Sequence, residues 1–476
     1  MKIKSVFFTV MAVFAFMACD NEVLNISNEL NEGDMKEKGY LVLNVTNPPT
    51  TRTSGENTDS GTAAESLITS LTVVLTDVTG KIVSFSTQTI ANGVSEKFEV
   101  ALGTYDVYAL INIPEEVEVE LGKKIEQVIE VAEAIDATSG FKGGSFFMVN
   151  KCHNDADKAG VTVTINSSHS ISNPAAAFIY VDRVACKIVI DTGKAPTITN
   201  LTSATGGVIK NVEVEGIAAL NVNKQFNLIQ TWNQLNAGGI PLDAKVLSTP
   251  LFTGTSQDLI AEQYFNNIGE FTTIQKDVDG KIIGILDETV GDGFYSKNPV
   301  YTTENRPTII ANGDDLTAGR GETTGVIYKV KAKKDGDTDL GTFYIFKNVF
   351  YTSIAAIQAL QEFDGVELED LSIPSLRALG IKVYEEGVMY YTYFIRDPNV
   401  NYQYKGKNYY GVFRNSTYKL AINTISSLGD DVPGGTIVDP TKPGEPGNPP
   451  IDTEETYIQV SVVVNKWILN TLNIDF

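Results

Sequence analysis

Apolar and polar residues alternate along many short stretches of the chain, a pattern typical of half-buried β-strands. The first stretch covers residues 39–45, where Leu41, Leu43 and Val45 share one face and two prolines follow closely. Similar stretches recur at short spacing, at residues 71–75, 82–85, 97–102, 105–111, 160–165, 177–190, 207–220, 325–331, 342–346, 387–395 and 409–424. Turn residues separate them, so the sequence predicts a mainly β fold of sandwich-like modules.

Helical spacing is rare in the sequence. It predicts one helical insertion at 115–134 and two short helices at 353–363 and 372–379. Residues 50–64 carry Thr, Ser, Gly, Asn and Asp with few apolar side chains, which indicates an exposed loop. The chain has 476 residues, a length that fits two such β modules in tandem.

The C-terminal end combines a linker with a strand. Residues 432–450 are rich in Pro and Gly, so we expect an extended arm. Beyond this arm Ile458, Val460, Val462 and Val464 fall on one face of an apolar strand. An unpaired apolar strand is an aggregation hazard. It can fold back into its own chain or enter a groove of another molecule, and the alternation alone leaves both open.

The N-terminal end has the features of an export signal. Two lysines precede an apolar run at residues 6–18, which is too short to span a bilayer and ends at Cys19. A small residue followed by Cys is what a lipoprotein signal peptidase recognises, although Phe16 stands where Leu is usual. We therefore expect lipid on Cys19. The alternative is a simple secretory signal with an incidental Cys.

Charge and chemistry exclude several classes of function. Acidic residues number 59 against 37 basic ones, which argues against a nucleic-acid binder. His153 adjoins Cys152, but adjacent side chains on an extended chain point in opposite directions. No catalytic motif is present, so we expect no enzyme activity and no cofactor. Cys152 and Cys186 could form a disulfide or stay free thiols.

Two further clusters have structural explanations. The stretch Asp335–Asp339 resembles the start of a calcium loop, but Leu340 occupies the position that needs Gly and Phe346 the position that needs Glu. A turn is therefore expected there, and another at 277–280, and no metal site. Tyrosines crowd residues 384–410, as sugar-stacking platforms do, although cross-strand pairs in a sheet explain them better.

Four stretches together resemble a known family. They are residues 102–108 with Asn112, residues 181–188, residues 304–305 with 323–328, and residues 411–418. The order and spacing of these motifs are similar to those of the type V pilins of Bacteroidales, most of all the stalk subunit of the short (minor) fimbrium. The second motif departs from the family pattern, with Asp182 in place of Glu and Cys186 in place of Ala.

The resemblance implies a mechanism of assembly. Type V pilins are exported as lipoproteins to the outer membrane, and an Arg-specific protease then cuts the loop after the first strand. The matching bond here joins Arg52 to Thr53. The first strand leaves, and a C-terminal strand from a neighbouring copy fills its place, so subunits join head to tail. Accessory tip and anchor pilins complete such fimbria, which support adhesion and biofilm formation.

The expected architecture is mainly β, with two tandem transthyretin-like sandwich domains, a few short helices and an extended C-terminal donor strand. The segments are a signal peptide (1–18), a lipidated propeptide (19–52), an N-terminal domain (53–228), a C-terminal domain (229–432), a linker (433–456) and a donor strand (457–476). Its donor residues are Ile458, Val460, Val462, Val464 and Trp467. The alternative functions are a tip or anchor pilin, or a monomeric surface lipoprotein that binds glycan or host protein.

Overall fold

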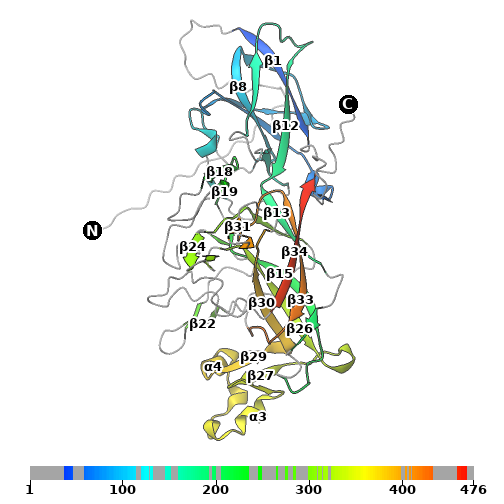
Figure 1. Ribbon diagram of the computed structural model, residues 1–476, viewed down its shortest axis with the longest axis vertical. Coiled ribbons are helices and arrows are strands. Elements are labelled where there is room, and N and C mark those ends of the chain that lie inside the picture. Colours follow the sequence, from blue (N-terminus) through cyan, green and yellow to red (C-terminus); the bar gives the residue numbers. More distant parts are fainter. Residues whose placement is uncertain are drawn as a thin grey trace, which may run out of the picture. The chain divides into compact units, whose positions relative to one another are not determined.

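Strands dominate the computed structural model, which confirms the mainly β class (Figure 1). The structure describes residues 37–46, 58–113, 119–127, 129–131, 145–151, 159–191, 196–199, 205–223, 225–234, 245–248, 264–265, 274–276, 282–285, 299–307, 309–312, 315–319, 323–397, 403–404, 407–408, 410–431 and 458–468. Lys38–Phe476 forms one compact unit. The predicted boundary between residues 228 and 229 stays a prediction.

The first sheet has ten strands and includes the beginning of the described chain. Its main path runs through β4 (Ile82–Gln88), β3 (Leu71–Thr76), β8 (Gly103–Ile111), β10 (Met148–Asn150), β12 (Ala175–Arg183), β1 (Lys38–Thr46), β6 (Val94–Ser95) and β5 (Ile90–Ala91). Two more strands pair from the side, β11 (Val161–Ile165) with β8 and β7 (Phe98–Ala101) with β1. Alternate side chains of β1 enter the core, as the period of two requires, whereas β3 is buried at every position.

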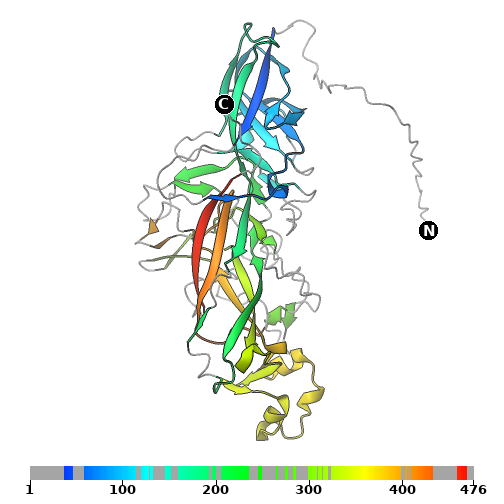
Figure 2. The ribbon, with the colours of Figure 1, turned by 90° about the vertical axis from the view of Figure 1, so that its right-hand side faces the viewer.

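The second sheet joins segments from very different parts of the chain. Its path is β2 (Thr58–Ser60), β34 (Ile458–Ile468), β33 (Ser416–Ile425), β13 (Ala185–Ile190) and β23 (Val300–Thr303), with β14 (Thr197–Ile198) paired to β33. The chain passes from the first sheet to the second at Val184, between β12 and β13. In Figure 2 the red β34 runs alongside the orange β33.

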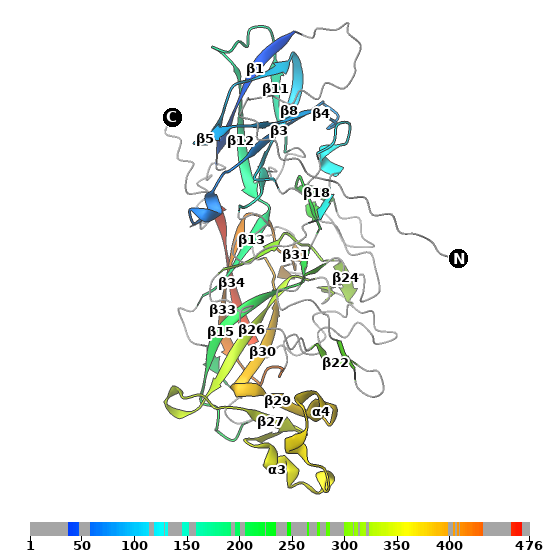
Figure 3. The ribbon, with the colours of Figure 1, turned by 180° about the vertical axis from the view of Figure 1, so that it is seen from behind.

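The third sheet carries many of the crowded tyrosines. It consists of β15 (Asn211–Leu220), β26 (Gly325–Lys333) and β30 (Val388–Phe394), which lie side by side in Figure 3. Tyr328 and Tyr391 are directly opposite each other and both are buried. Tyr384 stacks on Phe343 with ring centroids 4.4 Å apart. Tyr391 therefore packs in a cross-strand pair of this sheet, as predicted, whereas Tyr384 belongs to a separate sheet, in β29 (Ile381–Tyr384).

A smaller layer holds the two predicted short helices. It combines β28 (Val349–Tyr351), β27 (Phe343–Phe346) and β29 (Ile381–Tyr384) with α3 (Ile354–Gln358) and α4 (Ile373–Ala378). Ser372 caps α4 by accepting a hydrogen bond from the Ser375 backbone N–H. Short 3-10 turns lie at η5 (Gln361–Phe363), η6 (Leu368–Asp370) and η7 (Glu385–Gly387).

Six two-stranded ribbons complete the described strands. They are β9 (Ile129–Val131) with β17 (Gln225–Asn227), β16 (Val222–Asn223) with β20 (Tyr264–Phe265), β18 (Thr231–Gln234) with β19 (Lys245–Ser248), β21 (Ile274–Lys276) with β22 (Ile282–Ile285), β24 (Ile309–Asn312) with β25 (Asp315–Ala318), and β31 (Gln403–Tyr404) with β32 (Lys407–Asn408). The predicted turn at 277–280 lies between β21 and β22, outside the described residues.

Two local predictions were wrong. The described part of 115–134 holds only the 3-10 turn η2 (Ile125–Gln127) and the strand β9 instead of a helix, because β9 takes its hydrogen bonds from β17. The polar stretch 50–64 contains the strand β2, although its Gly, Asn and Asp residues disfavour strands. Pairing with distant segments overrode local propensity in both places.

Candidate functional site

The first strand is an interior strand of its sheet. β1 pairs in parallel with β12 on one side and antiparallel with β7 and β6 on the other. Leu41, Leu43 and Val45 are fully buried, as the alternation predicts. Ladder hydrogen bonds therefore hold β1 on both edges.

Neighbouring residues accommodate the large side chains of β1 and bond to its backbone. Leu41 lies opposite Ala175 and Leu43 opposite Ala177, so small side chains on β12 leave room for large ones on β1. The Leu43 backbone N–H donates to Ser95 Oγ at 2.9 Å, and the Val45 N–H to the Gly93 carbonyl at 2.7 Å. Removal of β1 would therefore leave an apolar slot lined by unpaired backbone groups.

The C-terminal strand lies in the second sheet of the same chain. β34 pairs antiparallel with β33 from Ile458, opposite Ile425, to Lys466, opposite Ser416. Ile458 is buried, and Val460 and Val462 are partly buried against the core. Val464 and Trp467 belong to the same strand by backbone register.

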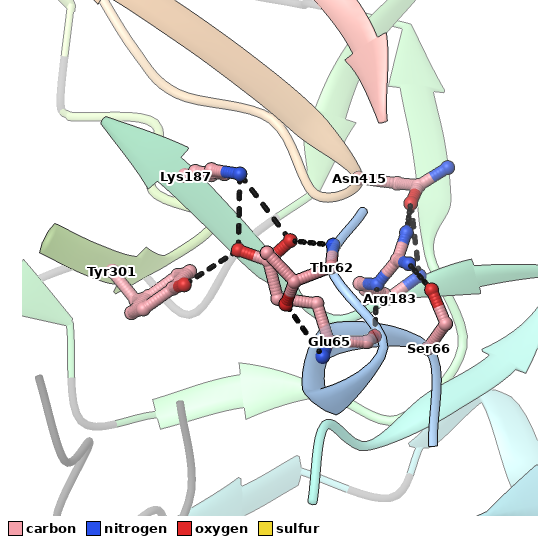
Figure 4. A network of polar contacts seen from close by, with 7 residues as sticks. All are labelled: Thr62, Glu65, Ser66, Arg183, Lys187, Tyr301 and Asn415. Carbon is pink, nitrogen blue, oxygen red and sulfur yellow. Dashed lines mark hydrogen bonds and ion pairs between the residues drawn. The ribbon is translucent and has the colours of Figure 1, made fainter. Parts of the chain in front are cut away.

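The segment that follows the predicted cleavage bond is anchored by a buried carboxylate. Glu65 accepts hydrogen bonds from Tyr301 Oη at 2.6 Å and from the Thr62 backbone N–H at 2.6 Å, and its Oε1 lies 3.0 Å from Lys187 Nζ (Figure 4). The Glu65 N–H donates in return to Thr62 Oγ1 at 3.2 Å. Residues 62–65 are thus fixed against β13 and β23 of the second sheet.

The surroundings set the charge of this anchor. Burial raises the pKa of Glu65, but the hydrogen bonds from Tyr301, Thr62 and Lys187 outweigh burial and bring that pKa below its usual value. Burial, reinforced by the hydrogen bond to Glu65, raises the pKa of Tyr301 well above its usual value. Burial lowers the pKa of Arg183 to about 10. Glu65 is therefore ionised and Tyr301 and Arg183 are protonated at neutral pH.

Two of the family-like motifs meet beside this anchor. Arg183 Nε donates to the Glu65 carbonyl at 2.8 Å, and Arg183 also contacts Ser66 Oγ and Asn415 Oδ1, each at 3.3 Å (Figure 4). Asn415 Nδ2 donates to Asp182 Oδ1 at 2.7 Å. The motif at residues 181–188 (the Asp-Arg motif) and the motif at residues 411–418 (the Arg-Asn motif) lie more than two hundred positions apart. Their contacts therefore join the two sheets at the point where the chain crosses between them.

Residues of the other two motifs, Glu304 and Asn112, make further contacts near the junction of the two sheets. Arg414 forms an ion pair with Glu304, and its guanidinium also donates to the Asn227 carbonyl at 2.8 Å. Asn112 Oδ1 accepts hydrogen bonds from the Thr69 N–H and hydroxyl, and its amide donates to the Leu67 carbonyl at 2.6 Å. The segment 62–70 is consequently fixed at two places, by the Glu65 cluster and by Asn112.

Several predicted site residues lie outside the described residues. These are Cys19, Arg52, Thr53, Cys152 and His153. Cys186 is a buried free thiol that donates to the Phe413 carbonyl at 3.0 Å, and burial raises its pKa well above the usual value.

The predicted turn at Asp335–Asp339 is present instead of a calcium loop. It holds the 3-10 turn η4 (Asp335–Asp337), and the Asp339 carboxylate pairs with Lys331 and Lys333. Within the described ranges no cluster of His, Cys, Asp or Glu could hold a metal ion. No helix in the described part of the chain has the length and apolarity to cross a membrane.

Sequence reasoning missed Glu65 as a functional residue. Its partners Lys187 and Tyr301 are 122 and 236 positions away, so no local pattern points to them. One local signal was available, because Thr62 and Glu65 have the spacing of a capping box. That signal would have placed an ordered turn at the end of the polar stretch.

Two segments of the chain match family models of fimbrial proteins. Residues 40–172 match a model described as major fimbrial subunit protein (FimA). Residues 382–473 match one described as major fimbrial subunit protein type IV, fimbrillin, C-terminal. The matches confirm the resemblance to fimbrial subunits and do not separate a minor from a major stalk subunit. None of the curated proteins matches the chain.

Solved structures of low sequence identity are similar along most of the chain. A fimbrilin (fimA) from Porphyromonas gingivalis W83 is 14% identical, with 90% of this chain and 98% of that chain covered and a TM-score of 0.43. A candidate cell adhesion protein from Parabacteroides distasonis ATCC 8503 is 14% identical, with coverage of 90% and 99% and a TM-score of 0.45. The tip fimbrial protein Mfa3 from Porphyromonas gingivalis is 13% identical, with coverage of 90% and 100% and a TM-score of 0.34.

Proposed function

We propose that the chain is a structural subunit of a cell-surface fimbrium. In this proposal it is exported as a lipoprotein through Cys19, cut between Arg52 and Thr53 by an Arg-specific protease, and polymerised head to tail by strand exchange. The two fimbrial family matches support the structural role. The processing and exchange steps rest on the arrangement of β1 and on the resemblance of the motifs.

The observation that carries the proposal is the interior position of β1. Burial of Leu41, Leu43 and Val45 contributes roughly 1.5–3 kcal/mol for each side chain, before the ladder hydrogen bonds are counted. A cut strand would therefore not leave an empty slot behind spontaneously. Replacement by another strand restores both the burial and the ladder, as in strand addition.

The donor in this scheme is the C-terminal segment of a neighbouring copy, with Ile458, Val460, Val462, Val464 and Trp467 as its donor residues. A contact between one end of a subunit and the other end of the next is heterologous, so it propagates into a filament instead of closing. Adhesion and biofilm formation would follow from that filament, with tip and anchor pilins at its ends.

Replacement of the cleavage residue tests the proposal. The variant Arg52→Ala should reach the cell surface with residues before Thr53 still attached and without fibres in electron micrographs. The control Thr53→Ser keeps the arginine and should be cut and polymerise like the natural chain. A normal yield of fibres from uncut Arg52→Ala chains would refute the processing step.

A further inference from the structure

The end of the C-terminal strand is covered by a short strand that follows the processing region. β2 pairs in parallel with β34, and its residues Thr58, Asp59 and Ser60 lie opposite Lys466, Trp467 and Ile468. The ladder between β33 and β34 extends only to Lys466. The last two residues of β34 therefore have β2 as their strand partner.

β2 is held in place from its downstream side. Glu65, Ser66 and Asn112 fix the segment 62–70 through buried and partly buried hydrogen bonds to both sheets. Only a few residues separate this anchor from Ser60, so the downstream end of β2 cannot move far.

β2 is also tied from its upstream side in the uncut chain. Residues 47–57 connect it to β1, and β1 is paired on both edges within the first sheet. In the uncut chain β2 is thus connected covalently to ordered elements on both sides. Three residues of parallel pairing are weak by themselves, because short two-stranded contacts are marginal in water.

We propose that residues 58–60 act as a strap that slows release of the C-terminal strand from its own chain until processing. This inference rests on the proposed cleavage after Arg52 and on strand donation by the C-terminal segment. A cut after Arg52 removes the upstream attachment and leaves β2 held by the Glu65 anchor alone. The end of β34 then separates from its edge more readily, so strand donation is faster from processed subunits than from uncut ones.

A reversible cross-link tests the strap in the full-length chain. Thr58 and Lys466 are register partners, and the Cα atoms of neighbouring strands lie within disulfide range. Thr58→Cys/Lys466→Cys chains should be cut after Arg52 normally, yet give at least tenfold fewer fibres when oxidised. A reductant should restore the fibres. Abundant fibres from oxidised, cross-linked chains would overturn the strap.

A matched cross-link controls for the disulfide itself. Thr72 and Thr87 are register partners in β3 and β4, which have no part in the proposed exchange. Thr72→Cys/Thr87→Cys chains should polymerise equally well with and without reductant. A natural chain that is not cut after Arg52, or is cut and yields no fibres, would refute the proposed function instead of the strap.

Hydrogen exchange gives an independent measurement on the natural chain. The amides of residues 466–468 should exchange at least tenfold faster in freshly cut monomers than in uncut chains. The amides of β3, away from the strap, should keep their rates. Unchanged exchange at 466–468 after complete cutting would also overturn the inference.

Discussion

At the scale of single residues, the most consequential group is the buried carboxylate of Glu65. Its side chain is 3% exposed and that of Lys187 is 8% exposed. A buried ion pair repays its desolvation only where the geometry is good and the remaining hydrogen bonds are made. Tyr301 and Thr62 supply those bonds here. The cluster therefore fixes the position of the chain after the cleavage region more than it adds to overall stability.

A double-mutant cycle tests this account in uncut chains that carry Arg52→Ala. Glu65→Leu and Lys187→Met should each lower the free energy of unfolding by about 3–5 kcal/mol, because each removes one member of a buried ion pair. The double variant should be less destabilised than the sum, since the pair is replaced by apolar side chains. Denaturant unfolding measures all four chains. Strict additivity would show that the two charges do not interact.

Acid should weaken the anchor. The folded-state pKa of Glu65 lies below its unfolded value of about 4.3, so the folded chain binds fewer protons there. Its contribution is complete above that unfolded value and is lost as the pH falls through the folded pKa. The stability difference between the natural chain and Glu65→Gln should therefore be constant above about pH 5.5 and shrink below about pH 4.

A surface carboxylate gives the comparison for the acid experiment. Glu369 is exposed and makes none of the contacts of the Glu65 cluster. Glu369→Gln should follow the natural chain throughout the titration. A stability difference for Glu65→Gln that is independent of pH would contradict the assignment of the acid-sensitive group.

At the scale of secondary-structure elements, the alternation of apolar and polar residues predicted which face of a strand is buried but not which other strands pair with it. It placed Leu41, Leu43 and Val45 on the buried face of β1, and the structure agrees. The same period cannot tell an interior strand from an edge strand, because the neighbours β12 and β7 come from distant segments. For the same reason the apolar face of β34 was predictable, whereas its pairing with β33 and β2 was not.

The candidate site was predictable to a smaller extent. The Asp-Arg and Arg-Asn motifs were identifiable as sequence, but their meeting at Arg183 and Asn415 is a consequence of how the chain crosses between sheets. The polar composition of 50–64 concealed β2, since only Thr58 of its three residues favours a strand and the pairing depends on the edge that β34 offers.

A cavity in the slot around β1 tests whether β1 is still present in the mature fibre. Leu43→Ala should destabilise the uncut chain by about 2–5 kcal/mol, because it opens a cavity opposite Ala177. In the proposed scheme mature fibres no longer contain β1, and a change in it should not alter their resistance to denaturant. The control Val42→Ala changes a side chain that is only half-buried and should have a smaller effect on the uncut chain.

Denaturant unfolding of uncut Arg52→Ala chains and of purified fibres provides the two measurements. A loss of fibre stability in the Leu43→Ala variant equal to the loss in the uncut chain would mean that β1 stays in the mature subunit. Equal stability of the fibres combined with a weaker uncut chain would be the expected result.

At the scale of the whole molecule, the two functional ends have separate roles in the proposed scheme. In that scheme the slot of β1 opens only after cutting, and the C-terminal strand acts as a donor only to the next subunit. Each role can therefore be removed without the other, because β1 and β34 belong to different sheets. A subunit without a slot can still donate, and a subunit without a tail can still accept.

Two variants that each lack one of these roles should therefore be able to form a single contact with each other. Chains with Arg52→Ala keep the tail but never open the slot, and chains without residues 457–476 are cut but have nothing to donate. Because the contact is head to tail, an equimolar mixture should give one-to-one dimers, since neither partner can extend the filament. Light scattering with mass analysis measures the dimer.

The separate samples provide the controls for this mixture. Each variant alone should stay monomeric, and natural cut chains should form long fibres under the same conditions. The strap affects the rate, because uncut chains hold the end of β34, so these dimers should form more slowly than fibres of natural cut chains. Fibres longer than dimers in the mixture would mean that another segment of the chain can act as the donor.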